Sequence, residues 1–197
     1  TRSSDGGPSW LQTTARTAGH ATVASVHADS SIWSIRPVRA DEIALLPALE
    51  AAADTMFAPF DHGAFPGPGT PEEFAAALIV LVAGEPPVGL CRIDTVGGGA
   101  HLEQLSVHPK HGRHGVGRAL LRAGIDWAEA GGYPELTLTT FRDVPWNGPF
   151  YVSEGFVEVG PADDWLVAHG LAPEEPVMAR YGTRIVMARR LGRLRTL

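Results

Sequence analysis

The stretch from Leu105 to Leu121 has the sequence LSVHPKHGRHGVGRALL, and it decides the fold. An apolar run of strand-forming residues meets a glycine loop, and a helical pattern follows the loop without a break. Glycines let successive backbone N–H groups point into one concavity, and the following helix adds its positive N-terminal end. This layout predicts a phosphate cradle, so a ligand with a pyrophosphate is the leading expectation. The loop glycines are Gly112, Gly115 and Gly117.

Composition bounds the class of protein. A chain of 197 residues suits one domain with a hydrophobic core. The net charge of −6 argues against a nucleic-acid partner, which needs a basic face. No apolar run reaches the ~18 residues of a membrane span, and no secretory signal pattern opens the sequence. We therefore expect no membrane partner and a cytoplasmic location, and the Ala, Gly, Pro and Arg usage is typical of a GC-rich bacterial genome.

The single cysteine, Cys91, excludes an internal disulfide and is interpreted as a buried structural thiol. Residues 1–31 are small, polar and aperiodic, which predicts a flexible N-terminal extension before a domain at 32–197. In that domain strands and helices alternate, which predicts a mixed α/β fold. Strands are expected at 32–38, 77–83, 88–95, 101–107, 136–140, 156–159 and 184–188, and helices at 41–53, from 70 onward, and at 116–130, 147–154 and 163–169.

The chain resembles the GNAT superfamily of N-acetyltransferases from about Ile32 to Arg190. The block from Leu105 to Leu121 resembles the acetyl-CoA loop, Arg/Gln-x-x-Gly-x-Gly/Ala, of that family. A second block, VPWNGPFYVSEGF from Val144 to Phe156, is similar to the later family helix ending in Phe-Tyr-x-x-x-Gly-Phe. The two blocks in this order, with a strand between them, are a specific signal. One departure is that Gly112 stands where the family pattern has Arg or Gln, with Arg113 directly after it.

The resemblance implies a fold with a central, mostly antiparallel twisted sheet, a splayed strand pair and helices on both faces. A Rossmann dinucleotide site is the competing interpretation of the glycines. Its pattern needs a third Gly or Ala, where this sequence has Leu120. A P-loop is excluded because no Gly-Lys-Ser/Thr occurs.

The resemblance also implies acetyl-CoA as acyl donor and no metal. The loop would hold the diphosphate, the backbones of Leu105 and Val107 would bind the pantetheine arm, and the Val107 N–H would face the thioester oxygen. Asn147 is interpreted as a helix cap that also meets this arm. The histidines beside the loop have no Cys or Asp cluster near them, which does not favour a zinc site. The predicted cofactor-binding residues are Leu105, Ser106, Val107, Gly112, Arg113, His114, Gly115, Val116, Gly117, Arg118, Asn147 and Tyr151.

Three residues are predicted to be catalytic. Strand alternation predicts that His101 and Glu103 share one face with Leu105 and Val107. In the superfamily, bases occur at positions that match Glu103 and His101, so either is expected to take a proton from the acceptor, with Glu103 the first choice. Tyr151 matches the family tyrosine whose hydroxyl lies near the cofactor sulfur and acts as general acid.

The acceptor region of the family matches the segment Thr55–Glu73. Its acids and apolar rings suit a cationic amine, although helix caps and solvated surface are the simpler explanation of the acids. The acids are Asp54, directly before this segment, and Asp61, Glu72 and Glu73 within it.

We therefore predict an N-acetyltransferase that moves the acetyl group to a primary amine of a small molecule or peptide by direct attack in a ternary complex. The alternatives are a non-catalytic module that binds acyl-CoA, or a transferase with another acyl donor or acceptor. The resemblance is compatible with a homodimer, and apolar residues such as Trp165 and Val167 could form its interface. The same residues could instead belong to the hydrophobic core.

Overall fold

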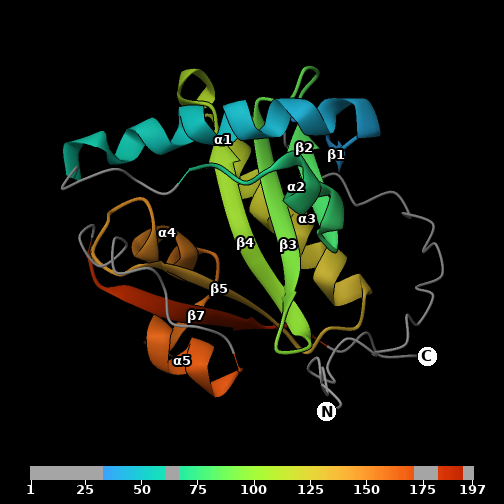
Figure 1. The fold of residues 1–197 in the computed structure, drawn as a ribbon. Coiled ribbons are helices and arrows are strands. Elements are labelled where there is room, and N and C mark those ends of the chain that lie inside the picture. The colour runs from blue at the N-terminus through green and yellow to red at the C-terminus, as the bar shows by residue number, and fades with distance from the viewer. Residues whose placement is uncertain (1–32, 61–66, 171–181, 193–197) are drawn as a thin grey trace, which may run out of the picture.

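The computed structural model of the protein describes residues 33–60, 67–170 and 182–192. The predicted extension at 1–31 and the acid Asp61 lie outside these ranges. Seven described strands form one sheet in the order β1-β2-β3-β4-β5-β7-β6 (Figure 1). They are β1 (Ile35–Pro37), β2 (Ile79–Ala83), β3 (Gly89–Val96), β4 (Gly99–Val107), β5 (Glu135–Phe141), β6 (Val157–Pro161) and β7 (Arg184–Arg190).

The described helices alternate with these strands. The α-helices are α1 (Leu46–Asp54), α2 (Pro71–Ala76), α3 (Val116–Ala130), α4 (Gly148–Ser153) and α5 (Ala162–Ala168). Short 3₁₀ turns are η2 (Ala40–Leu45), η3 (Thr55–Phe60) and η4 (Pro109–His111). The predicted helix at 116–130 is confirmed at both ends. The segment predicted as one helix at 41–53 starts as the 3₁₀ turn η2 and is α-helical only from Leu46, and the other predicted elements are present with bounds that differ by a few residues.

Helix α3 covers one face of the sheet and builds the main core. Its buried residues Leu120, Leu121 and Ile125 pack on the apolar faces of β2–β5 and β7. Two glycines permit a close approach between α3 and β3. A Cβ on Gly89 would lie 2.9 Å from Leu120 Cδ1, and one on Gly124 would lie 3.0 Å from Cys91 Sγ. Larger residues at these two positions would push α3 away from β3, the neighbour of the strand that leads into the glycine loop.

The opposite face is covered by α1 and α2 (Figure 1). Leu46, Leu49 and Phe74 form a second buried cluster with Val82 and Leu90. Helix α2 begins where the sequence predicts, because the side chain of its N-cap residue, Thr70, accepts from the Glu73 N–H while the Glu73 carboxylate accepts from the Thr70 N–H.

The sheet splits between β4 and β5, the only parallel neighbours among the described strands. These strands pair at three positions, Ala100↔Leu136, His101↔Thr137 and Leu102↔Leu138. Beyond Leu102 they diverge, so the rest of β4 has no partner on that side in the described structure (Figure 1). The predicted mixed sheet, mostly antiparallel with a splayed pair and helices on both faces, is confirmed.

The predicted shared face of His101, Glu103, Leu105 and Val107 is wrong. The register between β3 and β4 shifts, with Arg92 opposite Gln104 and Ile93 opposite Leu102. Glu103 is thus the extra residue of a β-bulge, which breaks simple alternation.

The bulge divides the residues of β4 between the two faces. Leu102 and Leu105 are opposite Ile93 and Cys91 and face α3, whereas His101 is opposite Asp94 on the other face.

Candidate functional site

The end of β4 presents unpaired backbone groups to the gap beside β5. The His108 N–H donates to the Val88 carbonyl at 2.9 Å, so this edge of the chain faces β3. Because successive residues of a strand point their N–H and C=O groups to opposite edges, those of Leu105 and Val107 point toward the gap. No described strand pairs with them there.

The glycine loop continues this edge into the N-terminus of α3. Gly115 is the N-cap residue, with φ 79° in the left-handed region that glycine adopts without strain. The Ala119 N–H donates to the Gly115 carbonyl at 3.0 Å. The N–H groups of Val116, Gly117 and Arg118 precede this first helical bond, so the helix itself provides no acceptor for them. Together with the helix dipole they form an anion-binding end.

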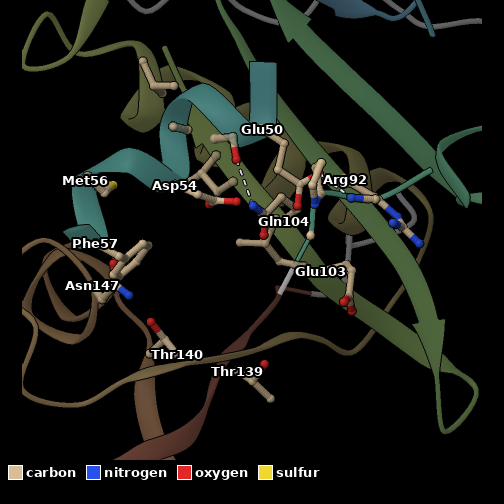
Figure 2. Close-up of a pocket in the computed structure, with 18 of the residues that line it drawn as sticks. Glu50, Asp54, Met56, Phe57, Arg92, Glu103, Gln104, Thr139, Thr140 and Asn147 are labelled. Carbon is tan, nitrogen blue, oxygen red and sulfur yellow. Dashed lines mark hydrogen bonds between the residues drawn. The ribbon is translucent and has the colours of Figure 1, made fainter. Parts of the chain in front are cut away.

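A cavity of about 600 Å³ lies in the gap between the splayed strands (Figure 2). Residues of α1, η3 and the turn before α2 line one side, and β4, β5 and the N-terminal end of α4 line the other. Its polar residues are Glu50, Asp54, Thr70, Glu73, Arg92, Glu103, Gln104, Ser106, Thr139, Thr140, Asn147, Tyr151 and Arg184. Five of the predicted binding residues, from β4 and from α4 with its N-cap, thus meet at one place: Leu105, Ser106, Val107, Asn147 and Tyr151.

Two carboxylates of α1 point into the cavity from successive turns (Figure 2). Glu50 accepts a hydrogen bond from the Gly69 N–H at 3.1 Å, and burial raises the pKa of its carboxyl. Asp54 has no hydrogen-bond partner in the described part of the chain. Burial, together with the negative charge of Glu50, raises the pKa of Asp54 to about 7. The cavity therefore contains a carboxyl that changes charge near neutral pH.

The cations of the cavity are engaged with their own neighbours. Arg92 pairs with Asp94 at 2.6 Å and lies over the Phe74 ring. Arg184 donates to the Thr139 hydroxyl at 2.9 Å and lies over the Phe141 ring. The acids Glu50, Asp54, Glu73 and Glu103 outnumber these two arginines, so the wall is acidic.

Glu103 lines the cavity from the bulge of β4 and is exposed. Figure 2 shows its carboxylate apart from that of Asp54. The following residue, Gln104, donates from Nε2 to the Ser106 hydroxyl at 2.9 Å, which fixes both side chains on the α1 face. The bulge thus brings an acid to the point where β4 and β5 separate.

Tyr151 and Asn147 line the cavity from the α4 side. The Tyr151 ring is half-buried and contacts Phe150 and Phe156 edge-on. Burial raises the pKa of its phenol, so the hydroxyl is protonated at neutral pH. Asn147 occupies the N-cap position of α4 but makes no side-chain cap bond there, so capping the helix does not engage its amide.

His101 lies away from the cavity. It is 3% exposed, its Nδ1 is 2.8 Å from the Thr137 hydroxyl, and its ring stacks on Trp165 of α5. Burial, with Arg184 and His169 nearby, lowers the pKa of His101 to about 4. The structure therefore places His101 and Glu103 in different surroundings, with only Glu103 at the cavity. Of the two apolar residues considered for a dimer, Trp165 stacks on His169 and Val167 is 56% exposed.

Arg118, predicted at the cofactor loop, directs its side chain to α4. Its Nε is 2.6 Å from the buried Glu154 carboxylate, which also pairs with Arg122 at 2.9 Å. Only the backbone N–H of Arg118 remains for a ligand at the helix end. This ion cluster, which sequence spacing does not reveal, joins α3 to the helix that carries Tyr151.

Cys91 is fully buried, and burial raises the pKa of its thiol to about 12. A thiolate does not form there near neutral pH, so Cys91 is a packing residue. Within residues 33–60, 67–170 and 182–192, no group of three His, Cys, Asp or Glu residues is arranged to hold a metal ion.

Sequence reasoning missed Glu50, Arg92 and Trp33. Glu50 precedes Asp54 by one helical turn, and this spacing was the available signal. The indole of Trp33, by contrast, hydrogen-bonds the loop from 81 positions away, and no local pattern predicts such a contact.

A family model described as the acetyltransferase (GNAT) family matches residues 47–156. The match contains the splayed strands, the glycine loop and most of α1. The chain belongs to this family. It is therefore an acyltransferase of the GNAT type, and the resemblance stated from the two sequence blocks is confirmed.

Solved structures share this GNAT fold. The ribosomal-protein-S18-alanine N-acetyltransferase from Escherichia coli has a TM-score of 0.58 and 23% identity, covering 84% of this chain and 99% of its own. The PaiA N-acetyltransferase from Thermoplasma acidophilum, solved with coenzyme A, has a TM-score of 0.58 and 14% identity, with coverage of 80% and 98%. A putative phosphinothricin N-acetyltransferase has a TM-score of 0.59 and 18% identity, with coverage of 81% and 99%. None of the described helices is long and apolar enough to cross a membrane.

Proposed function

We propose that this GNAT protein transfers the acetyl group of acetyl-CoA to a primary amine of a cationic small molecule or peptide. One observation carries the proposal: the unpaired edge of β4 leads directly into the free N-terminus of α3. A strand edge suits the amides of a pantetheine arm, and a helix N-terminus suits a diphosphate. The two are adjacent in the chain, in the order that one extended acyl-CoA molecule requires.

The donor would be held mostly by the backbone. Leu105 and Val107 offer hydrogen bonds along the gap, and Val107 presents its N–H to the thioester oxygen. Gly115, Val116, Gly117 and Arg118 offer the N–H groups of the diphosphate cradle, with Gly112, Arg113 and His114 forming the approach. Asn147 contacts the pantetheine arm from the α4 side.

Glu103 takes a proton from the bound acceptor, directly or through water. This step is required because a primary ammonium has a solution pKa of about 10. The freed amine attacks the thioester carbon, the C–S bond breaks, and Tyr151 donates its proton to the departing sulfur. The new amide nitrogen releases its extra proton, which restores the Tyr151 phenol directly or through water. Cys91 is buried with a raised pKa, which favours direct transfer over an acyl-cysteine intermediate.

The acidic wall supports a cationic acceptor. Glu50 and Asp54 of α1 face the cavity, and the two nearby arginines already have partners. Close carboxylates attract an ammonium group and hold it beside the donor. Met56 and Phe57 add an apolar surface for the rest of the acceptor.

Calorimetric titration of the protein with acetyl-CoA, beside CoA and NADH, tests the donor. Saturable binding of acetyl-CoA and CoA without binding of NADH is expected. Thiol release is then measured with a panel of cationic, neutral and anionic amines of similar size, and the cationic amines should react fastest.

Three other outcomes contradict parts of the proposal. A protein that does not bind acetyl-CoA is not an acetyl-CoA enzyme. Binding without turnover of any amine points to a module that only holds acyl-CoA. Turnover restricted to neutral or anionic amines refutes the cationic acceptor while leaving the transferase intact.

A further inference from the structure

The second half of the glycine loop has an unusual backbone. Arg113 has φ 61° and Gly115 has φ 79°, so both residues that flank His114 are left-handed. The first half is held by its own bonds, from His111 N–H to the His108 carbonyl at 2.8 Å and from Gly112 N–H to the Pro109 carbonyl at 3.1 Å. The peptide that joins His114 to Gly115 lies beyond these bonds.

Trp33 reaches this peptide from the beginning of the described domain. Its indole Nε1–H donates to the His114 carbonyl at 3.0 Å. The Trp33 ring packs against the core between α3 and the sheet, and it meets the His111 ring edge-on at 6.0 Å. The donor is therefore held by packing on one side and by the loop on the other.

The direction of this bond decides which group the loop offers to a ligand. In a trans peptide, the carbonyl oxygen and the following N–H point in opposite directions. Trp33 precedes β1, on the side of the sheet away from β5, whereas the ligand gap lies between β4 and β5 (Figure 1). A His114 carbonyl directed toward Trp33 therefore turns the Gly115 N–H away from Trp33, toward the gap side.

The loop sequence lacks a side chain that the family pattern has, which makes the Trp33 contact more important. The Arg or Gln of the family pattern is replaced by Gly112, so the loop lacks that side chain. A Cβ at this position would lie 3.2 Å from the Pro109 carbonyl oxygen, a tight contact that a larger residue could occupy only if the turn shifted. Support from outside the loop comes instead from the Trp33 indole.

We propose that Trp33 is a positioning residue for the donor: its hydrogen bond fixes the His114–Gly115 peptide so that an N–H, rather than a carbonyl oxygen, faces the diphosphate. The inference rests on the proposed binding of acetyl-CoA. Without the bond, the peptide is free to rotate about ψ of His114 and φ of Gly115, which a glycine tolerates, and in the rotated form the carbonyl dipole repels the anion. Trp33 touches no reacting atom and acts only through His114.

The test is Trp33→Phe, which keeps an aromatic ring in the core and removes the N–H donor. The dissociation constant for acetyl-CoA, measured by calorimetry, should rise about three- to ten-fold, as expected for one lost hydrogen bond. The value of kcat at saturating acetyl-CoA should stay within about two-fold of the wild type, because the transfer step does not use the loop.

Acetylpantetheine, which lacks the diphosphate, separates positioning from general damage. Trp33→Phe should lower kcat/KM for acetyl-CoA and leave kcat/KM for acetylpantetheine unchanged. Trp127→Phe is the matched control, because Trp127 lies in the C-terminal half of α3, far along the helix from the loop, and stacks on Tyr133. Trp33→Leu is the second variant should Trp33→Phe fail to fold, because it keeps an apolar side chain against the core and also removes the N–H donor.

Two results would overturn the inference while the proposed function stands. One is an unchanged dissociation constant for acetyl-CoA in a folded Trp33 variant. The other is an equal loss of kcat/KM for acetyl-CoA and acetylpantetheine. A wild-type protein that does not bind acetyl-CoA overturns the proposed function itself, and this inference with it.

Discussion

The donor side and the acceptor side of the cavity are built in different ways. On the donor side, the ligand-facing groups are backbone N–H and C=O groups of one continuous segment, from the end of β4 into α3. On the acceptor side they are side chains from α1, η3, β3 and β4, which are far apart in the chain. Backbone sites depend on local conformation, whereas side-chain sites depend on packing. The two sides should therefore respond to different kinds of substitution.

The largest expected effect is at the acid of the bulge. Glu103→Gln should lower kcat by about 10²-fold, because a positioned base contributes about that factor or more. The dissociation constant for acetyl-CoA should not change, since the donor side uses the backbone. Steady-state kinetics with calorimetry measures both, and Glu72→Gln, an exposed acid of α2, is the control. An unchanged kcat would remove Glu103 from the mechanism.

The next effect is at the proposed acid. Tyr151→Phe should lower kcat by roughly ten-fold or more, since the thiolate then leaves without a positioned proton. Melting temperature should hardly change because the ring remains. Tyr133→Phe, which alters a tyrosine stacked on Trp127, should behave like the wild type. Full activity of Tyr151→Phe would show that this residue only packs.

A backbone substitution should affect the donor side alone. Gly115→Val places a β-branched residue at φ 79°, which costs about 1–2 kcal/mol and distorts the loop. Acetyl-CoA affinity should fall about ten-fold. Gly98→Val is a matched control, because Gly98 has φ 81° and, like Gly115, has open space around its Cβ position. Equal loss of affinity in both variants would refute a specific role for the loop.

The smallest effect concerns pH and Asp54. Burial and the nearby Glu50 raise the pKa of Asp54 in the folded protein to about 7, above the ordinary value of 3.8. The folded protein therefore keeps a proton that the unfolded chain releases, and this contribution to stability is present below about pH 4 and lost as pH rises through about 7. Asp54→Asn should raise the melting temperature more at pH 8 than at pH 5, by roughly a degree or two. Thermal melts at both pH values check this, and an equal shift would place the carboxyl in water.

The sequence predicted the elements of the proposed donor side because their determinants are local. Glycine spacing, a strand-forming run and a helical period identify β4, the loop and α3 within about twenty residues. The prediction that His101 and Glu103 share a face was wrong because Glu103 is an extra residue in β4. This bulge breaks the alternation, and His101 lies in a buried ring stack with Trp165 of α5. The sequence also missed Glu50 and Trp33, whose roles depend on how α1 and the start of the domain pack against distant segments.

The three-position join between β4 and β5 divides the sheet into two panels, β1–β4 and β5–β7, with α3 lying across both. A ligand seated in the gap would take the place of the missing strand ladder. Its binding would then stabilise the contact between the panels, by an amount that grows with the logarithm of one plus the ratio of ligand concentration to dissociation constant. Amide hydrogen exchange along the facing edges of β4 and β5 should therefore slow together when the donor is present. Only the ligand-free protein should open between the two panels as a separate cooperative unit.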